Sequence, residues 1–121
     1  MTIVRRESNS RLSRSVTFGN LVFLAGQVPS AAASSLTEQT WEVLRKVEAL
    51  LVEANSSKRH LLSVSIWLAD ITQIEEMNSV WEQWAEPGHL PARATVEAKL
   101  ASPNYLIEVS AIAAVTGAPG P

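Results

Sequence analysis

The sequence predicts an α+β fold, a two-layer sandwich with two helices on one face of a mostly antiparallel sheet. Two long segments carry apolar residues at helical spacing, and several shorter runs before, between and after them are typical of strands. With 121 residues the chain can bury one core but not two separate ones. We therefore expect a single domain over residues 1–121, with residues 116–121 as a loose tail.

The N-terminal part is expected to form a β-meander. A first strand is predicted near residues 2–6, and runs at residues 15–18 and 21–25 flank the pair Gly19-Asn20. Both residues of this pair tolerate positive φ, which a tight hairpin turn requires. Residues 26–29 end the third run. Residues 30–35, rich in Ala and Ser, are typical of a loop.

The first helix is predicted over residues 36–54. Ser35 and Glu38 have the spacing of a capping box at its start, and Asn55 can end it in a left-handed conformation. Its apolar residues recur at helical spacing: Trp41, Leu44, Val47 and Leu51.

The second helix is expected to begin near Asp70 or Thr72 and to end at Pro87-Gly88. Thr72 with Glu75 repeats the capping-box pattern. The residues that share its apolar face are Ile74, Met77, Val80, Trp81 and Trp84.

Three strands are predicted in the rest of the chain. Residues 60–68 are apolar and β-branched, residues 92–100 alternate between small apolar and polar side chains, and residues 105–115 contain one charge, Glu108. Residues 101–104 suit a turn, so the last two strands are expected to form a hairpin. The strands at 60–68 and 105–115 are apolar on both faces, whereas two helices cover only one. The second face is therefore expected to meet another subunit.

Composition narrows the classes of function. Ten Lys and Arg residues against twelve Asp and Glu residues give a net charge of −2, which does not favour nucleic acid as a partner. The chain has no Cys, and His60 and His89 lack the spacing of metal ligands, so we expect neither a metal nor a cofactor. There is no signal-peptide core and no long apolar run, which favours a cytoplasmic location and no membrane contact.

Arg93 is the first candidate site residue because it lies on a predicted strand, directly after Pro91-Ala92, and not on a mobile loop. A guanidinium held in this way can bind a carboxylate through two parallel hydrogen bonds. The alternative is an exposed charge on the polar face of the strand, paired with Glu97 or with nothing.

Glu108 is the second candidate, since a carboxylate inside an apolar strand must be paired, hydrogen-bonded or protonated. An ion pair with Arg93 or Lys99 is an equally good interpretation. In a hairpin with a two-residue loop, Thr95 would face Glu108 and Arg93 would lie diagonally, roughly 7–8 Å away between backbones. That spacing would admit a small substrate between the two side chains.

Two further residues could contact a ligand. Asn78 lies within the apolar arc of the second helix, where a buried amide must bind either nearby backbone or a ligand. His89 lies in the loop before Arg93 and could approach a ligand or be simply exposed.

The motifs, taken in order, resemble the Rid family of reactive-intermediate deaminases, also called the YjgF family. The resemblance spans most of the chain, from about residue 15 to residue 114. The stretches that carry it are Gly19-Asn20-Leu21-Val22-Phe23-Leu24-Ala25-Gly26-Gln27-Val28, Glu38-Gln39-Thr40, Leu68-Ala69-Asp70-Ile71, Met77-Asn78, Pro91-Ala92-Arg93-Ala94-Thr95-Val96-Glu97 and Ile107-Glu108-Val109.

This resemblance implies a chorismate-mutase-like fold and a homotrimer with three sites in the clefts between subunits. It implies that Arg93 binds the carboxylate of a small substrate, that Glu108 positions or activates water, and that Asn78 supports the site. The activity it implies is hydrolysis of a 2-imino or enamine acid to the 2-keto acid and ammonia, with groups near Thr95 and Ala25 also touching the substrate.

The chain departs from the family pattern at three positions. Many members that act on 2-aminoacrylate have Tyr, Ser and Cys where this chain has Leu12, Ala25 and Thr95. These differences indicate another branch of the family, with a more apolar pocket. The alternative function is a non-catalytic module that binds a 2-keto acid through Arg93. RNA cleavage, which has also been attached to the wider family, is disfavoured by the acidic charge balance.

Overall fold

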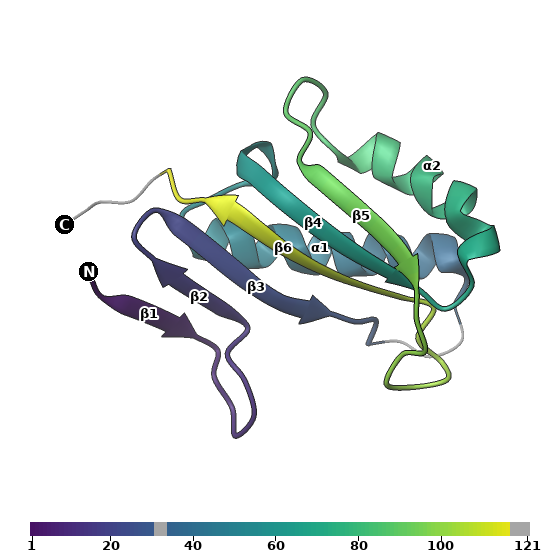
Figure 1. Cartoon of the computed structure of the whole chain (residues 1–121), viewed down its shortest axis with the longest axis horizontal. Coiled ribbons are helices and arrows are strands. Elements are labelled where there is room, and N and C mark those ends of the chain that lie inside the picture. Colours follow the sequence, from purple (N-terminus) through teal and green to yellow (C-terminus); the bar gives the residue numbers. More distant parts are fainter. Residues whose placement is uncertain (31–33, 117–121) are drawn as a thin grey trace.

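The chain forms a six-stranded sheet with two helices against one face (Figure 1). This computed structural model describes residues 1–30 and 34–116, so parts of the expected loop at 30–35 and tail at 116–121 lie outside the described residues. The strands are β1 (Ile3–Arg6), β2 (Ser15–Phe18), β3 (Leu21–Gln27), β4 (Leu61–Leu68), β5 (Ala92–Glu97) and β6 (Ile107–Ala114). Their order across the sheet is β1-β2-β3-β6-β4-β5, and only the β4–β5 pair is parallel. The predicted α+β class is confirmed.

The N-terminal meander is confirmed, with Gly19 at a φ of 63° in the turn between β2 and β3. Strand β3 runs to Gln27, two residues beyond its predicted end. The register against β6 shifts between Leu24 and Gln27, which is a β-bulge that lets the strand continue past Gly26.

Helix α1 (Leu36–Glu53) begins at the predicted residue and ends one residue before its predicted end. The Ser35 side chain accepts from the Glu38 backbone N–H, and the Glu38 carboxylate accepts from the Ser35 backbone N–H, which completes the capping box. After the helix, Asn55 has a φ of 62°. A short 3₁₀ turn, η1 (Lys58–His60), then leads into β4.

The second helix begins later in the sequence than predicted. A 3₁₀ turn, η2 (Ile71–Gln73), comes first, and helix α2 (Ile74–Trp84) follows without a side-chain cap. Asp70 Oδ1 accepts from both the backbone N–H and the hydroxyl of Thr72, at 3.0 and 2.6 Å. Thr72 lies inside η2, and the N-cap residue of α2 is Gln73, so the expected Thr72–Glu75 capping box does not form.

The predicted C-terminal hairpin is also wrong. Strand β6 lies between β3 and β4, so both of its edges are already paired. Strand β5 instead pairs with the outer edge of β4 in parallel, and β4, α2 and β5 form a β-α-β unit. The loop after β5 therefore carries the chain across β4 to the centre of the sheet.

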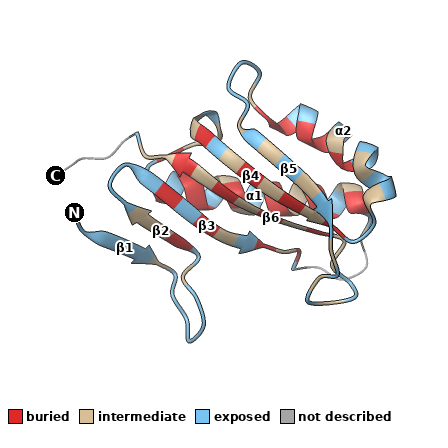
Figure 2. Cartoon of the chain, viewed as in Figure 1, coloured by how far each residue is buried: buried red, intermediate tan, exposed pale blue. Residues whose placement is uncertain are grey.

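The two faces of the sheet have different surroundings. Side chains that point toward the helices form the core with the apolar faces of α1 and α2. The other face, which we call the open face, turns away from α1 and has no helix or strand of the described residues against it (Figure 2). Large apolar side chains remain partly exposed there: Phe18, Leu21, Phe23 and Val96. These apolar residues thus lie on the open face, but on β2, β3 and β5. The strands at 60–68 and 105–115, from which the sequence predicts this apolar face, carry the polar residues Ser65, Ser110 and Glu108 there.

Candidate functional site

Arg93 points toward the helix layer and is held by two side chains of α2. It pairs with Val64, a core residue of β4, which places its side chain on the helix face of the sheet. Its Nη2 donates to Asn78 Oδ1 at 2.8 Å, and its guanidinium carbon lies 5.2 Å from the centre of the Trp81 ring. Arg93 and Asn78 are thus brought together as neighbours on adjacent elements.

The charge of Arg93 is only partly compensated. Burial lowers the pKa of the Arg93 guanidinium, and the carboxylates of Glu82 and Glu75 on α2 act in the opposite direction. No carboxylate in residues 1–30 or 34–116 forms an ion pair with it. A guanidinium carries five N–H donors, and Asn78 takes one of them. This partly desolvated cation therefore has donors left for an incoming anion.

Thr95 lies two residues further along β5, on the same face as Arg93, because it pairs with the core residue Ile66. Its hydroxyl oxygen is buried and has no hydrogen-bond partner among the described residues. A buried hydroxyl without a partner is costly and calls for an explanation.

Glu108 lies on the opposite face of the sheet from Arg93. It pairs with Trp67, whereas Arg93 pairs with Val64, and residues three apart on a regular strand point to opposite faces. The expectation that one hairpin would bring Arg93 and Glu108 together is therefore wrong within a single chain. The physical reason is the pairing of β5 with β4, which separates it from β6.

Glu108 packs directly against the backbone of Gly26 in the β-bulge. A Cβ added at Gly26 would lie 2.0 Å from Glu108 Oε2, so only glycine leaves room for the carboxylate. In the described part of the chain, that carboxylate has no hydrogen bond or ion pair. Gly26 was interpreted from sequence only as the end of a run, although a glycine inside a strand often marks close approach by another group.

A hollow of about 340 Å³ lies next to this bulge. Ala25 and Gly26 line it together with Leu12 and Tyr105. Leu12 and Ala25 thus lie together, as two of the positions where the chain departs from the family pattern. Tyr105 also borders a second hollow of about 600 Å³ along the loop after β5. Neither Arg93 nor Glu108 lines either of these two hollows.

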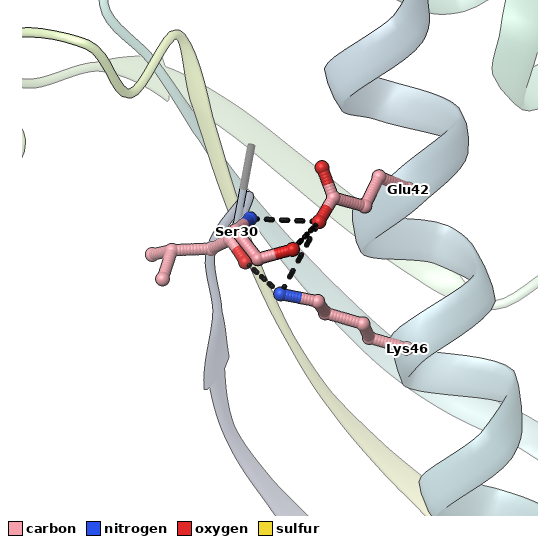
Figure 3. Close-up of polar contacts among 4 residues, drawn as sticks. Ser30, Glu42 and Lys46 are labelled. Atoms are coloured by element: carbon pink, nitrogen blue, oxygen red, sulfur yellow. Dashed lines mark hydrogen bonds and ion pairs between the residues drawn. The ribbon is translucent and has the colours of Figure 1, made fainter. Parts of the chain in front are cut away.

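The segment that follows Gly26 is fixed to α1 by a polar cluster (Figure 3). Glu42 accepts from the backbone N–H of Ser30 at 2.7 Å and from its hydroxyl. Lys46 lies 3.5 Å from Glu42 and donates to the carbonyl of Val28 at 2.7 Å. The two Ser30 hydrogen bonds, with Lys46 nearby, lower the pKa of Glu42. The cluster thereby fixes one wall of the hollow.

His89 lies apart from these groups in the exposed loop before β5. Its Nε2 is 3.0 Å from Arg59 Nη2, a contact in which the arginine donates and the imidazole accepts. A ligand role for His89 stays a prediction. The candidate residues thus form two groups, one with Arg93, Asn78 and Thr95 on the helix face, and one with Ala25 and Glu108 at the bulge.

Neither a metal site nor a membrane-spanning helix is found in residues 1–30 and 34–116. No three side chains of His, Asp or Glu gather there in a way that could hold a metal ion. No helix of this part of the chain is both long and apolar enough to cross a membrane.

Comparison with known proteins gives one consistent family. The family model described as Endoribonuclease L-PSP matches residues 2–115. A RutC family protein of Haemophilus influenzae is 40% identical over 114 residues, which cover 93% of this chain and 98% of the relative. The RutC family protein YoaB of Escherichia coli K12 is 37% identical over 115 residues, covering 95% of this chain and all of YoaB.

Solved structures agree with this assignment. The crystal structure of a YjgF family member from Neisseria meningitidis superposes with a TM-score of 0.94 at 38% identity, and the match covers 98% of each chain. The chain belongs to the Rid/YjgF family, as its motifs predict.

Proposed function

We propose that this protein is an imine or enamine deaminase that acts on a small 2-imino carboxylic acid. The observation that carries the proposal is the state of Arg93, a cation that is partly buried and braced by Asn78 and Trp81, with no ion pair among the described residues. Such an arrangement suits a carboxylate ligand. Folding has already removed part of the water around the guanidinium, and a bidentate pair with a carboxylate would offset that desolvation cost.

Glu108 supports a hydrolytic role. Its carboxylate is held against Gly26 and faces away from the core, with no hydrogen bond or ion pair to another described residue. A free carboxylate beside a bound substrate can orient a water molecule and accept its proton. Because Glu108 and Arg93 lie on opposite faces of one sheet, we propose that each site combines Arg93 of one chain with Glu108 of a neighbouring chain.

The open face supports an oligomer with such shared sites. Its partly exposed residues, Phe23 and Val96 among them, form the kind of apolar surface that a subunit interface covers. We propose a homotrimer, in which three equivalent interfaces would create three sites.

The proposed reaction has one addition and one elimination. Arg93 holds the carboxylate, and backbone groups near Thr95 orient the same ligand. The water oxygen then bonds to the C=N carbon as Glu108 takes one water proton, and Glu108 returns that proton to the imine nitrogen. The hydroxyl proton of the resulting carbinolamine moves to the same nitrogen as the C–N bond breaks, so that ammonia leaves and the 2-keto acid remains.

A binding module without catalysis is the second candidate. It is favoured by the separation of the two groups within one chain, because Arg93, Asn78 and Thr95 could bind a 2-keto acid without Glu108. RNA cleavage, which the description of the family model names, is less well supported by a chain of net charge −2.

The test is release of ammonia and keto acid from imino acids generated in place by an amino-acid oxidase. Wild type is compared with Arg93→Ala and Glu108→Gln. The matched control is Arg45→Ala, because Arg45 also lies over an indole, 5.9 Å from the Trp41 ring, but on α1.

We expect wild type and Arg45→Ala to accelerate the reaction and the two site variants to lose most of the acceleration. If Glu108→Gln were as active as wild type, the hydrolytic role would be refuted. If wild type were inactive on all imino acids but bound keto acids through Arg93, the binding module would replace the enzyme.

A further inference from the structure

Trp81 belongs to a contiguous series of side chains that begins at Arg93 and ends at Glu48 on α1. The Trp81 and Trp84 rings are 5.6 Å apart and inclined at 49°. The Trp84 ring is approached by the ammonium of Lys58 at 5.3 Å, and its Nε1 donates to Glu48 on α1 at 3.2 Å. The Trp84 ring is thus anchored through Lys58 and Glu48, and Trp81 packs beside it.

Trp81 is buried more deeply than a surface platform would be. Its exposed fraction is 7% and that of Trp84 is 4%. An indole face in this position attracts the guanidinium and limits its tilt, while the hydrogen bond to Asn78 fixes rotation in the guanidinium plane. Two contacts of different geometry thus restrain one cation.

We infer that Trp81 is a positioning residue for Arg93, which presets the guanidinium plane for a ligand carboxylate before the ligand arrives. This inference rests on the proposed function, since it assumes that Arg93 receives a carboxylate. Trp81 would then contribute to the binding free energy without touching the ligand. The reason is that a guanidinium fixed in advance loses less entropy when the ligand binds.

The experiment measures binding and turnover in wild type and three variants of α2, and binding alone in Arg93→Ala. Dissociation constants for 2-oxobutanoate are compared with KM and kcat for the imino acid that wild type hydrolyses fastest. The variants are Trp81→Leu, which removes the aromatic face, Trp81→Phe, which keeps one, and Trp84→Leu. Trp84→Leu is the matched control because Trp84 is buried to a similar degree in the same helix, while the cation–π contact and hydrogen bond of Arg93 among the described residues go to Trp81 and Asn78.

We expect Trp81→Leu to raise the dissociation constant and KM about tenfold with kcat within about threefold, since the lost restraint acts on bound substrate and transition state alike. Trp81→Phe should stay within about threefold of wild type in both constants. Trp84→Leu should lower the thermal stability as much as Trp81→Leu but leave KM within about threefold. The inference is overturned if Trp81→Leu binds like wild type, or if Trp84→Leu weakens binding equally.

A measurement on the wild-type protein keeps the inference testable if Trp81→Leu does not fold. Nuclear magnetic resonance of the Arg93 side chain, assigned by its loss in Arg93→Ala, reports rotation of the guanidinium. We expect resolved, slowly rotating Nη groups in wild type and also in Trp81→Phe, which keeps an aromatic face. Fully averaged signals in wild type, like those of an exposed arginine, would overturn the inference.

Failure of this inference and failure of the proposed function give different results. If Arg93→Ala binds 2-oxobutanoate as well as wild type does, Arg93 is not the carboxylate site and the proposed function fails. If Arg93→Ala loses binding while both Trp81 variants retain it, only the positioning role fails.

Discussion

Gly26→Ala tests the role of Glu108 without altering that residue. The added Cβ would lie 2.0 Å from Glu108 Oε2 and 2.9 Å from its Cδ. An ordinary contact begins near 3.4 Å, so the carboxylate oxygen must retreat by about 1.4 Å. A displacement of this size at a catalytic group typically costs about 10²-fold in rate, and we expect a loss of that order in kcat.

The fold should tolerate this substitution. Gly26 does not have a positive φ, and its nearest obstacle is the end of a side chain that can rotate. Alanine also reduces the entropy of the unfolded chain, which stabilises by about 0.4–1 kcal/mol and offsets part of the strain. Thermal unfolding followed by circular dichroism should therefore give a Tm within a few degrees of wild type.

A double variant shows whether the effect acts through Glu108. In the Glu108→Ala protein the obstacle is absent, so adding Gly26→Ala should not lower its stability further. In the wild-type background, any strain caused by Gly26→Ala should lower the stability. The reasoning is refuted if Gly26→Ala keeps the imine-hydrolysis rate of wild type within about threefold, or if it unfolds the Glu108→Ala protein.

Three other substitutions test the core, the loop anchor and the open face. Leu51→Ala should lower the free energy of unfolding, measured by urea titration, by about 2–5 kcal/mol because Leu51 is fully buried. Val52 is 62% exposed, so the control Val52→Ala should change this free energy by no more than about 0.5 kcal/mol. The pKa of Glu42 is lowered in the folded protein. Its ionised carboxylate therefore stabilises the fold above its ordinary titration range, and this contribution is lost as the pH falls through the folded-state pKa. Wild type should therefore lose more stability between pH 7 and pH 3 than Glu42→Gln, and equal pH profiles would show that the Ser30 contacts add nothing. Phe23→Lys on the open face should shift the mass measured by light scattering from that of the proposed trimer to that of a monomer, while Val52→Lys on α1 should leave it unchanged. An unchanged mass for Phe23→Lys would exclude this face as the interface.

Local sequence signals predicted the elements well where a single short-range interaction decides them. Ser35 and Glu38 complete each other's hydrogen bonds over three residues, and Gly19 and Asn55 adopt the positive φ that their residue types permit. At Thr72 the local pattern was misleading, because Asp70 caps the 3₁₀ turn η2 through the Thr72 backbone N–H and α2 begins only at Ile74.

The pairing partner of β5 could not be predicted from its own pattern. Alternation at residues 92–97 correctly placed Arg93 and Thr95 on one face, but alternation does not say which neighbour a strand chooses. The order strand, helix, strand over β4, α2 and β5 was itself a signal for a β-α-β unit and a parallel pair, and the turn-like residues 101–104 masked it.

The candidate site was predicted in its parts but not in its arrangement. Contact between Arg93 and Asn78 follows from the β-α-β unit, which sets α2 beside β5. The place of Glu108 on the other face depends on a long-range register that no local motif specifies. Gly26 and Trp81 were assigned to a strand end and to the core, because their roles appear only once Glu108 and Arg93 lie beside them.

The claim that each site combines two chains is tested most directly by mixing two inactive variants. Arg93→Ala and Glu108→Gln are denatured, combined in equal amounts and refolded, and imine hydrolysis is measured against each variant refolded alone. If one site takes Arg93 from one chain and Glu108 from its neighbour, random assembly gives both intact residues in about one quarter of the sites, and about one quarter of wild-type activity should return. A mixture no more active than the two variants refolded separately would contradict a site shared between chains.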